Sequence, residues 1–212
     1  MRVHGGHDHN HPMNAKPISL TQTVSSWQGA LPLSDLALIR AEGPDAAAFL
    51  HGQLSQDVSH LGPSEARLAA YCSAKGRMQA SALLLRPAEE QVWLLTDAGI
   101  LPGWLKRLKM FVLRSKVQLT EGGLQAWGLA GESAAKTLGD AANAPVWSSQ
   151  PHASGQLVRL PDVQQVPRWL WLGAPADPTH EAGLTKPAPW RLRPRPSPPN
   201  HPPGPRPASP PR

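Results

Sequence analysis

The stretch ARLAAYCSAKGRMQASALLLR, residues 66–86, predicts a β-hairpin. Its two apolar, alternating runs flank a four-residue link, Ser73–Gly76, as in two half-buried strands joined by a tight connection. Gly76 is expected to supply a positive φ in this link, because glycine has no Cβ to clash there. Cys72 lies between apolar neighbours and is expected to be a small buried hydrophobe.

The segments around the hairpin predict a mixture of strands and short helices. A helix is expected at 45–53 after Pro44, whose missing N–H is tolerated at a helix start. Strands are expected at 36–41, 91–96, 116–120, 124–129, 157–160 and 168–172, and a further helix at 134–138. Strands and helices do not alternate regularly, so the predicted fold class is α+β with a mostly antiparallel sheet.

Pro102 opens an amphipathic surface helix. Its apolar side holds Trp104, Leu105, Leu108 and Phe111, whereas Lys106, Arg107 and Lys109 occupy the other side. Trp104 and Phe111 are expected in the core, and stacking against a ligand ring is the alternative for both.

The two ends of the chain differ in composition from its middle. Residues 1–26 are polar and carry His4, His7, His9 and His11, which could bind zinc or nickel but lack a rigid scaffold, so a solvated segment is expected. Residues 173–212 lose all periodicity, and their last 26 residues, 187–212, hold 12 prolines and five arginines. A disordered or polyproline II tail is expected there. The folded region is therefore expected at 27–172.

Composition excludes several classes of protein. The formal net charge is +6, but 187–212 supply five arginines and no acid, which leaves about +1 for the rest of the chain and argues against direct nucleic-acid binding. The single cysteine allows no internal disulfide. There is no run of about 18 apolar residues and no signal-peptide core at the start. We expect a cytoplasmic protein without a membrane partner.

Four segments carry a recognisable pattern: FLHGQLSQDV at 49–58, YCSAKGRM at 71–78, LKRLKMFVLRSKV at 105–117 and WGLAG at 127–131. Together they make the stretch 33–129 resemble the first domain of the YgfZ-type folate-binding proteins, non-catalytic relatives of the glycine-cleavage (GcvT) aminomethyltransferases. The later family segment K-G-C-(Y/F)-x-G-Q-E, with its reactive cysteine, is absent from this sequence. Cys72 belongs to the hairpin motif and does not replace that cysteine.

This resemblance implies a GcvT-like α+β fold with a central pocket for tetrahydrofolate. It implies an accessory role in iron–sulfur cluster assembly or repair and, through it, in tRNA modification, with iron–sulfur enzymes as partners. In the related aminomethyltransferases an aspartate on the second hairpin strand activates the folate amine, whereas this chain has Ala80 and Ser81 there. Binding without aminomethyl transfer is expected. An aminomethyltransferase-like enzyme and an interaction module with a Pro-rich tail are the alternatives.

The candidate folate-binding residues lie in these motifs and are Gln53, Asp57, Tyr71, Lys75, Gly76, Arg77 and Arg114. If the helix continued, Gln53 and Asp57 would share one side and could pair with the donor and acceptor edge of a pterin; local turn chemistry is the alternative. Lys75 and Arg77 could bind the glutamate tail of a folate or a phosphate, or be solvated charges of the turn. Arg114 is placed at the start of a strand, where an anionic ligand and a surface salt bridge both remain open.

The change of composition near Gly173 falls where the family would continue toward its second half. We therefore expect a truncated or out-of-frame family member beyond that point. A pocket that lacks one wall loses burial and preorganisation, so weak folate binding is expected.

Overall fold

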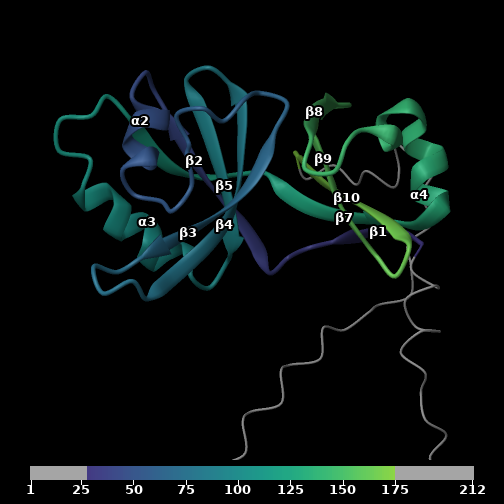
Figure 1. The fold of residues 1–212 in the computed structure, drawn as a ribbon, viewed down its shortest axis with the longest axis horizontal. Helices are drawn as coiled ribbons and strands as arrows, with labels where there is room; N and C mark the ends of the chain where they lie inside the picture. Colours follow the sequence, from purple (N-terminus) through teal and green to yellow (C-terminus); the bar gives the residue numbers. More distant parts are fainter. Residues whose placement is uncertain (1–27, 175–212) are drawn as a thin grey trace, which may run out of the picture.

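The computed structural model describes residues 28–174, which form two five-stranded sheets flanked by helices (Figure 1). The first sheet has the strand order β3-β4-β5-β2-β6. Its strands are β2 (Leu36–Glu42), β3 (Ala66–Cys72), β4 (Met78–Ala88), β5 (Gln91–Asp97) and β6 (Gln118–Gly122). All of its neighbouring strands pair antiparallel, and β3 and β4 form the hairpin that the sequence predicts.

The second sheet has the order β1-β7-β10-β9-β8 and is also antiparallel throughout. Its strands are β1 (Gly29–Pro32), β7 (Gln125–Ala130), β8 (Ser149–His152), β9 (Gly155–Val163) and β10 (Val166–Gly173). Strand β1 precedes the strands of the first sheet in sequence, and the other four strands of the second sheet follow them. The chain therefore forms one strand of the second sheet, then the whole first sheet, and then the rest of the second sheet. This return brings β1 beside β7, with Gly29 opposite Ala130.

Four helical segments accompany the sheets: α2 (Ala46–His51), α3 (Leu101–Met110), α4 (Gly131–Leu138) and the 3-10 helix η1 (Gly139–Asn143). Helices α2 and α3 lie on the outer side of the first sheet, and α4 lies against the second sheet at the opposite end of the molecule (Figure 1). Pro102 occupies the first turn of α3, as its sequence position predicts.

Both sheets bury side chains on both of their faces, which produces four layers. In β5, Val92 and Leu94 point into the core beneath α2 and α3, while Trp93 and Leu95 point toward the second sheet. This period of 2 is the alternation of a strand covered on each face. The side chains between the two sheets, here called the inter-sheet core, are Leu38, Ala66, Leu83, Leu85, Trp93, Leu95, Ala126, Val158, Leu170 and Leu172.

The α+β class and the antiparallel pairing are confirmed, but the expectation of one sheet is wrong. The predicted strand at 116–120 begins only at Gln118, and the predicted helix at 45–53 covers Ala46–His51. The sequence did not predict β1 or β8, since each is only four residues long. Such short strands carry too few alternations to be distinguished from loop sequence.

Two predictions about burial are also wrong, and one is confirmed. Trp104 is 4% exposed and belongs to the core, as expected. Phe111 is 44% exposed, and Cys72 is exposed as well. Cys72 follows a register shift at the far end of β3, beyond the strand positions that the second sheet covers. The alternation of apolar and polar residues shows which face of a strand is apolar. It does not show how much of that face the second sheet covers.

Some expectations concern residues outside the described range. The histidines His4, His7, His9 and His11 and the proposed tail lie outside residues 28–174, except that Gly173 ends β10. Within the described residues, no helix is long and apolar enough to cross a membrane.

Candidate functional site

The chain that leaves α2 folds back along the outer edge of β3. Leu54 forms an isolated antiparallel bridge with Tyr71. Next to it, the Ser55 amide donates to the Ala70 carbonyl at 2.9 Å, and the Ala70 amide donates to Ser55 Oγ at 2.9 Å. Sheet edges expose unpaired backbone groups. Here the motif at 49–58 covers part of such an edge, so two of the sequence motifs lie side by side.

This path places Gln53 and Asp57 outside helix α2. The helix ends at His51, so the two residues do not share a helical face, and that expectation is wrong. Gln53 lies beside the Tyr71 end of β3, whereas the Asp57 carbonyl accepts a hydrogen bond from Arg67 Nη1 at 2.9 Å. The Asp57 carboxylate lies near the end of α2, at 3.2 Å from His51 Nδ1. Among the described residues, no hydrogen bond joins the side chains of Gln53 and Asp57.

The Asp57 side chain is engaged in local hydrogen bonds. Its carboxylate accepts from the His60 amide at 3.2 Å and lies 2.8 Å from His60 Nδ1 and 3.2 Å from His51 Nδ1. The hydrogen bonds from His60 hold the pKa of Asp57 below its ordinary value of 3.8, and the charge of His51 adds a smaller effect in the same direction. Turn chemistry, the alternative considered for this residue, accounts for its contacts.

We expect Asp57→Asn to lower the melting temperature slightly at pH 6. A depressed carboxyl pKa means that the folded state favours the ionised form, so the stabilisation is present above pH 3.8 and is lost as the pH falls through the lower, folded-state pKa. The difference between wild type and variant should therefore shrink below about pH 3.8, as measured by thermal denaturation across a pH series. Asp140→Asn is the control, since Asp140 is exposed. A difference that grows in acid would contradict this prediction.

Tyr71 joins β3 to helix α3. Its ring is 6% exposed and lies 5.8 Å, centroid to centroid, from the ring of Trp104. Its hydroxyl oxygen accepts a hydrogen bond from Arg107 Nε at 2.8 Å. Arg107 is itself exposed. The predicted residue Tyr71 is thus a buried support for a surface guanidinium that the sequence did not single out.

The hairpin tip presents two cations to solvent. The Gly76 amide donates to the Ser73 carbonyl at 2.9 Å, and Gly76 has φ +72°, so its predicted positive φ is confirmed. Lys75 and Arg77 are exposed, and neither forms an ion pair with another described residue. The tip therefore offers positive charge without an internal counterion.

Arg114 lies in the loop between α3 and β6. It is exposed and precedes β6 by several residues, so its predicted place at the start of a strand is wrong. It makes no salt bridge among residues 28–174. No contact of the described residues brings it to Tyr71 or to the hairpin tip.

Strand β4 carries no carboxylate side chain between Met78 and Ala88. Ala80 is the cross-strand partner of Tyr71 and is 3% exposed, and Ser81 lies opposite Ala70. The next residues, Ala82 to Leu85, are apolar and buried. The residues of β4 opposite Tyr71 and Ala70 therefore offer a methyl group and a hydroxyl group.

A groove that the sequence did not predict runs along the start of β3. It has a volume of about 520 Å³ and is lined by Gln56, Glu65, Ala66, Arg67, Leu68, Val146 and Trp147. The Ala66 amide donates to the Trp147 carbonyl at 2.8 Å, which fixes the segment before β8 against the strand. Trp147 has φ +65°, an uncommon conformation for a side chain of this size. None of the predicted site residues lines the groove. Its two walls come from segments that are distant in sequence, so no local sequence pattern predicts it.

The described residues hold no group of His, Cys, Asp and Glu side chains suited to bind a metal ion. Asp57 and its two histidines do not form such a group.

Comparison with known proteins identifies the fold. No family model matches the chain. An uncharacterized protein of Haemophilus influenzae is 37% identical over 106 residues, which are 50% of this chain and 38% of that protein. The structure is similar to the glycine cleavage system aminomethyltransferase T from Bartonella henselae, with TM-score 0.63 and 20% identity over 73% of this chain and 45% of the other. The chain thus spans less than half the length of either protein.

A second solved structure, the heterotetrameric sarcosine oxidase from Corynebacterium sp. U-96, aligns with TM-score 0.47 and 13% identity over 72% of this chain and 82% of the other. The aminomethyltransferase comparison alone shows the fold: the antiparallel α+β architecture of this chain resembles that of part of the aminomethyltransferase.

Proposed function

We propose that this chain binds a reduced folate and does not transfer an aminomethyl group. The observation that carries the proposal is the pairing of Tyr71 with Ala80 on the hairpin. The hairpin motif, which resembles that of folate-binding proteins, has Gly76 at positive φ and the exposed cations Lys75 and Arg77 at its tip, and this supports the proposal. The resemblance places the acid of the related enzymes at about Ala80 or Ser81, and neither of these residues is a carboxylate that could accept a proton.

Two features of the site support a folate as the ligand. A folate combines flat aromatic rings with a terminal glutamate. Helix α3 offers the exposed ring of Phe111 and the exposed cation Arg107, and the hairpin tip offers the exposed cations Lys75 and Arg77. Aromatic contact and charge-assisted hydrogen bonding are the interactions that such a ligand requires.

The same sequence resemblance extends the proposal to a biological role. We propose an accessory function in iron–sulfur cluster assembly or repair and, through it, in tRNA modification, with iron–sulfur enzymes as partners in the cytoplasm. Mass spectrometry of modified tRNA nucleosides from a deletion strain tests this part. Unchanged nucleoside levels would contradict the accessory role and leave folate binding to stand on its own measurements.

Calorimetry with tetrahydrofolate tests the binding. We expect a dissociation constant weaker than about 1 μM, because the exposed face of the hairpin and α3 leaves a ligand partly in water. An aminomethyl-transfer assay with an aminomethylated carrier protein should show no turnover above the folate-free background, since Ala80 and Ser81 supply no base. The absence of any binding at millimolar ligand would refute the first half of the proposal, and clear turnover would refute the second.

A further inference from the structure

Arg107 is a surface cation whose orientation is set by the core. Its Nε donates to the hydroxyl of Tyr71 at 2.8 Å, and Tyr71 is 6% exposed and packed against Trp104. A single hydrogen bond from Nε leaves the two terminal nitrogens of the guanidinium for other acceptors, in a plane that the buried ring helps to define. Most exposed arginines have no such support.

The guanidinium has no anionic partner within the described part of the chain. Arg107 forms none of the ion pairs found there, and no Asp or Glu occurs between Asp97 and Glu121. The same segment carries the further cations Lys106, Lys109, Arg114 and Lys116, all exposed. The positive charge of this segment therefore favours an external anion near α3.

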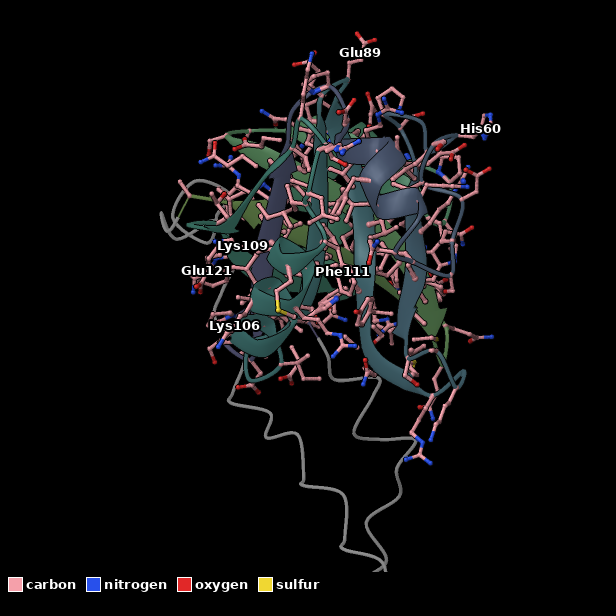
Figure 2. The ribbon with its side chains drawn as sticks, turned by 90° about the vertical axis from the view of Figure 1, so that its left-hand side faces the viewer. His60, Glu89, Lys106, Lys109, Phe111 and Glu121 are labelled. Atoms are coloured by element: carbon pink, nitrogen blue, oxygen red, sulfur yellow. The ribbon has the colours of Figure 1, made fainter. Side chains whose placement is uncertain are left out.

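An exposed aromatic ring lies one helical turn beyond Arg107. Phe111 is 44% exposed at the end of α3, and residues four apart on a helix are neighbours, with Cβ atoms about 5–6 Å apart. Lys106 and Lys109 lie on the other side of α3 from Phe111 (Figure 2). The side of α3 that carries Arg107 therefore combines a fixed guanidinium with an apolar ring, while the other side carries lysines alone.

We propose that Arg107 and Phe111 form a binding surface for a ligand that joins an aromatic ring to a carboxylate group. The ligand is the p-aminobenzoyl-glutamate part of a folate. This inference rests on the proposed function. The guanidinium pairs with a glutamyl carboxylate through two parallel hydrogen bonds, and Phe111 contacts the benzoyl ring. Tyr71 is a positioning residue that acts through the guanidinium. Inorganic phosphate could pair with Arg107 but has no apolar group to contact the ring of Phe111.

The test is calorimetry or NMR titration of the full chain with three ligands: p-aminobenzoyl-L-glutamate, tetrahydrofolate, and a tetrahydropterin that lacks the p-aminobenzoyl-glutamate part. We expect Arg107→Gln to weaken the first two by about tenfold or more, since it removes a charge-assisted pair, and to leave the tetrahydropterin unchanged. Arg107→Lys should rescue only part of this loss, because lysine keeps the charge without the planar fork. Tyr71→Phe keeps the buried ring and should produce a smaller loss for the same two ligands.

Lys109→Gln is the matched control, because it removes one exposed charge from the same helix on the side away from Phe111. It should change each affinity by less than about twofold. Equal losses for Lys109→Gln and Arg107→Gln, no binding of p-aminobenzoyl-L-glutamate to the wild type, or displacement of this compound by equimolar inorganic phosphate would overturn the inference. If p-aminobenzoyl-L-glutamate binds through Arg107 but tetrahydrofolate binds no more tightly than p-aminobenzoyl-L-glutamate does, the proposal of folate binding is refuted. The proposed binding surface at Arg107 and Phe111 still stands in that case.

Discussion

Gly43→Ala should lower the free energy of unfolding by about 3 kcal/mol or more, enough to unfold a chain of marginal stability. Gly43 has φ +133°, and a Cβ at this position would lie 2.3 Å from the carbonyl oxygen of Lys116. The Lys116 backbone cannot easily withdraw, because its amide donates to Asp45 Oδ2 at 2.6 Å and its carbonyl accepts from the Asp45 amide at 3.3 Å. Backbone strain and a backbone clash therefore act together.

Two other glycines separate these contributions. Gly76 has φ +72°, but a Cβ added there would meet no atom within 4 Å, so Gly76→Ala should cost only the conformational strain, about 1 kcal/mol. Gly103 lies in α3 with open space around it, so Gly103→Ala should be neutral or stabilising by up to ~1 kcal/mol. Urea denaturation of the three variants gives the comparison. A loss for Gly43→Ala no larger than that for Gly76→Ala would show that the close approach of Lys116 is not maintained in solution.

Leu85→Ala should cost about 3 kcal/mol, within the usual range of ~2–5 kcal/mol for a buried leucine. Leu85 is 0% exposed and belongs to the inter-sheet core, which holds residues of both sheets, including Leu172 at the end of β10. The cost arises only if the second sheet covers this face of β4. The experiment therefore tests whether the two sheets fold as one cooperative unit, and the unfolding transition should remain single.

Leu68→Ala is the control for that measurement. Leu68 lies in β3 of the same sheet but is 60% exposed, so the same substitution should cost less than about 1 kcal/mol. Similar losses for the two variants, or an early transition confined to one sheet, would mean that the inter-sheet core does not form as described.

The sequence determined those features that arise from the local conformation of the backbone. The hairpin at 66–86, the positive φ of Gly76 and the start of α3 at Pro102 all follow from residue types and their spacing, because sterics within a few residues decide them. The candidate residues of the hairpin came instead from the resemblance in the sequence motifs. The resemblance in the motifs also agreed with the fold of the structural neighbour.

Only the tertiary structure decided how these elements are covered and combined. Alternation in β5 and β10 shows two apolar faces but not that a second sheet covers one of them, and it did not reveal that Cys72 and Phe111 are exposed. The bond between Arg107 and Tyr71 joins residues 36 positions apart, and the groove between Arg67 and Trp147 joins segments still farther apart. Burial and side-chain pairing depend on what packs opposite a residue, and local sequence carries little information about that partner.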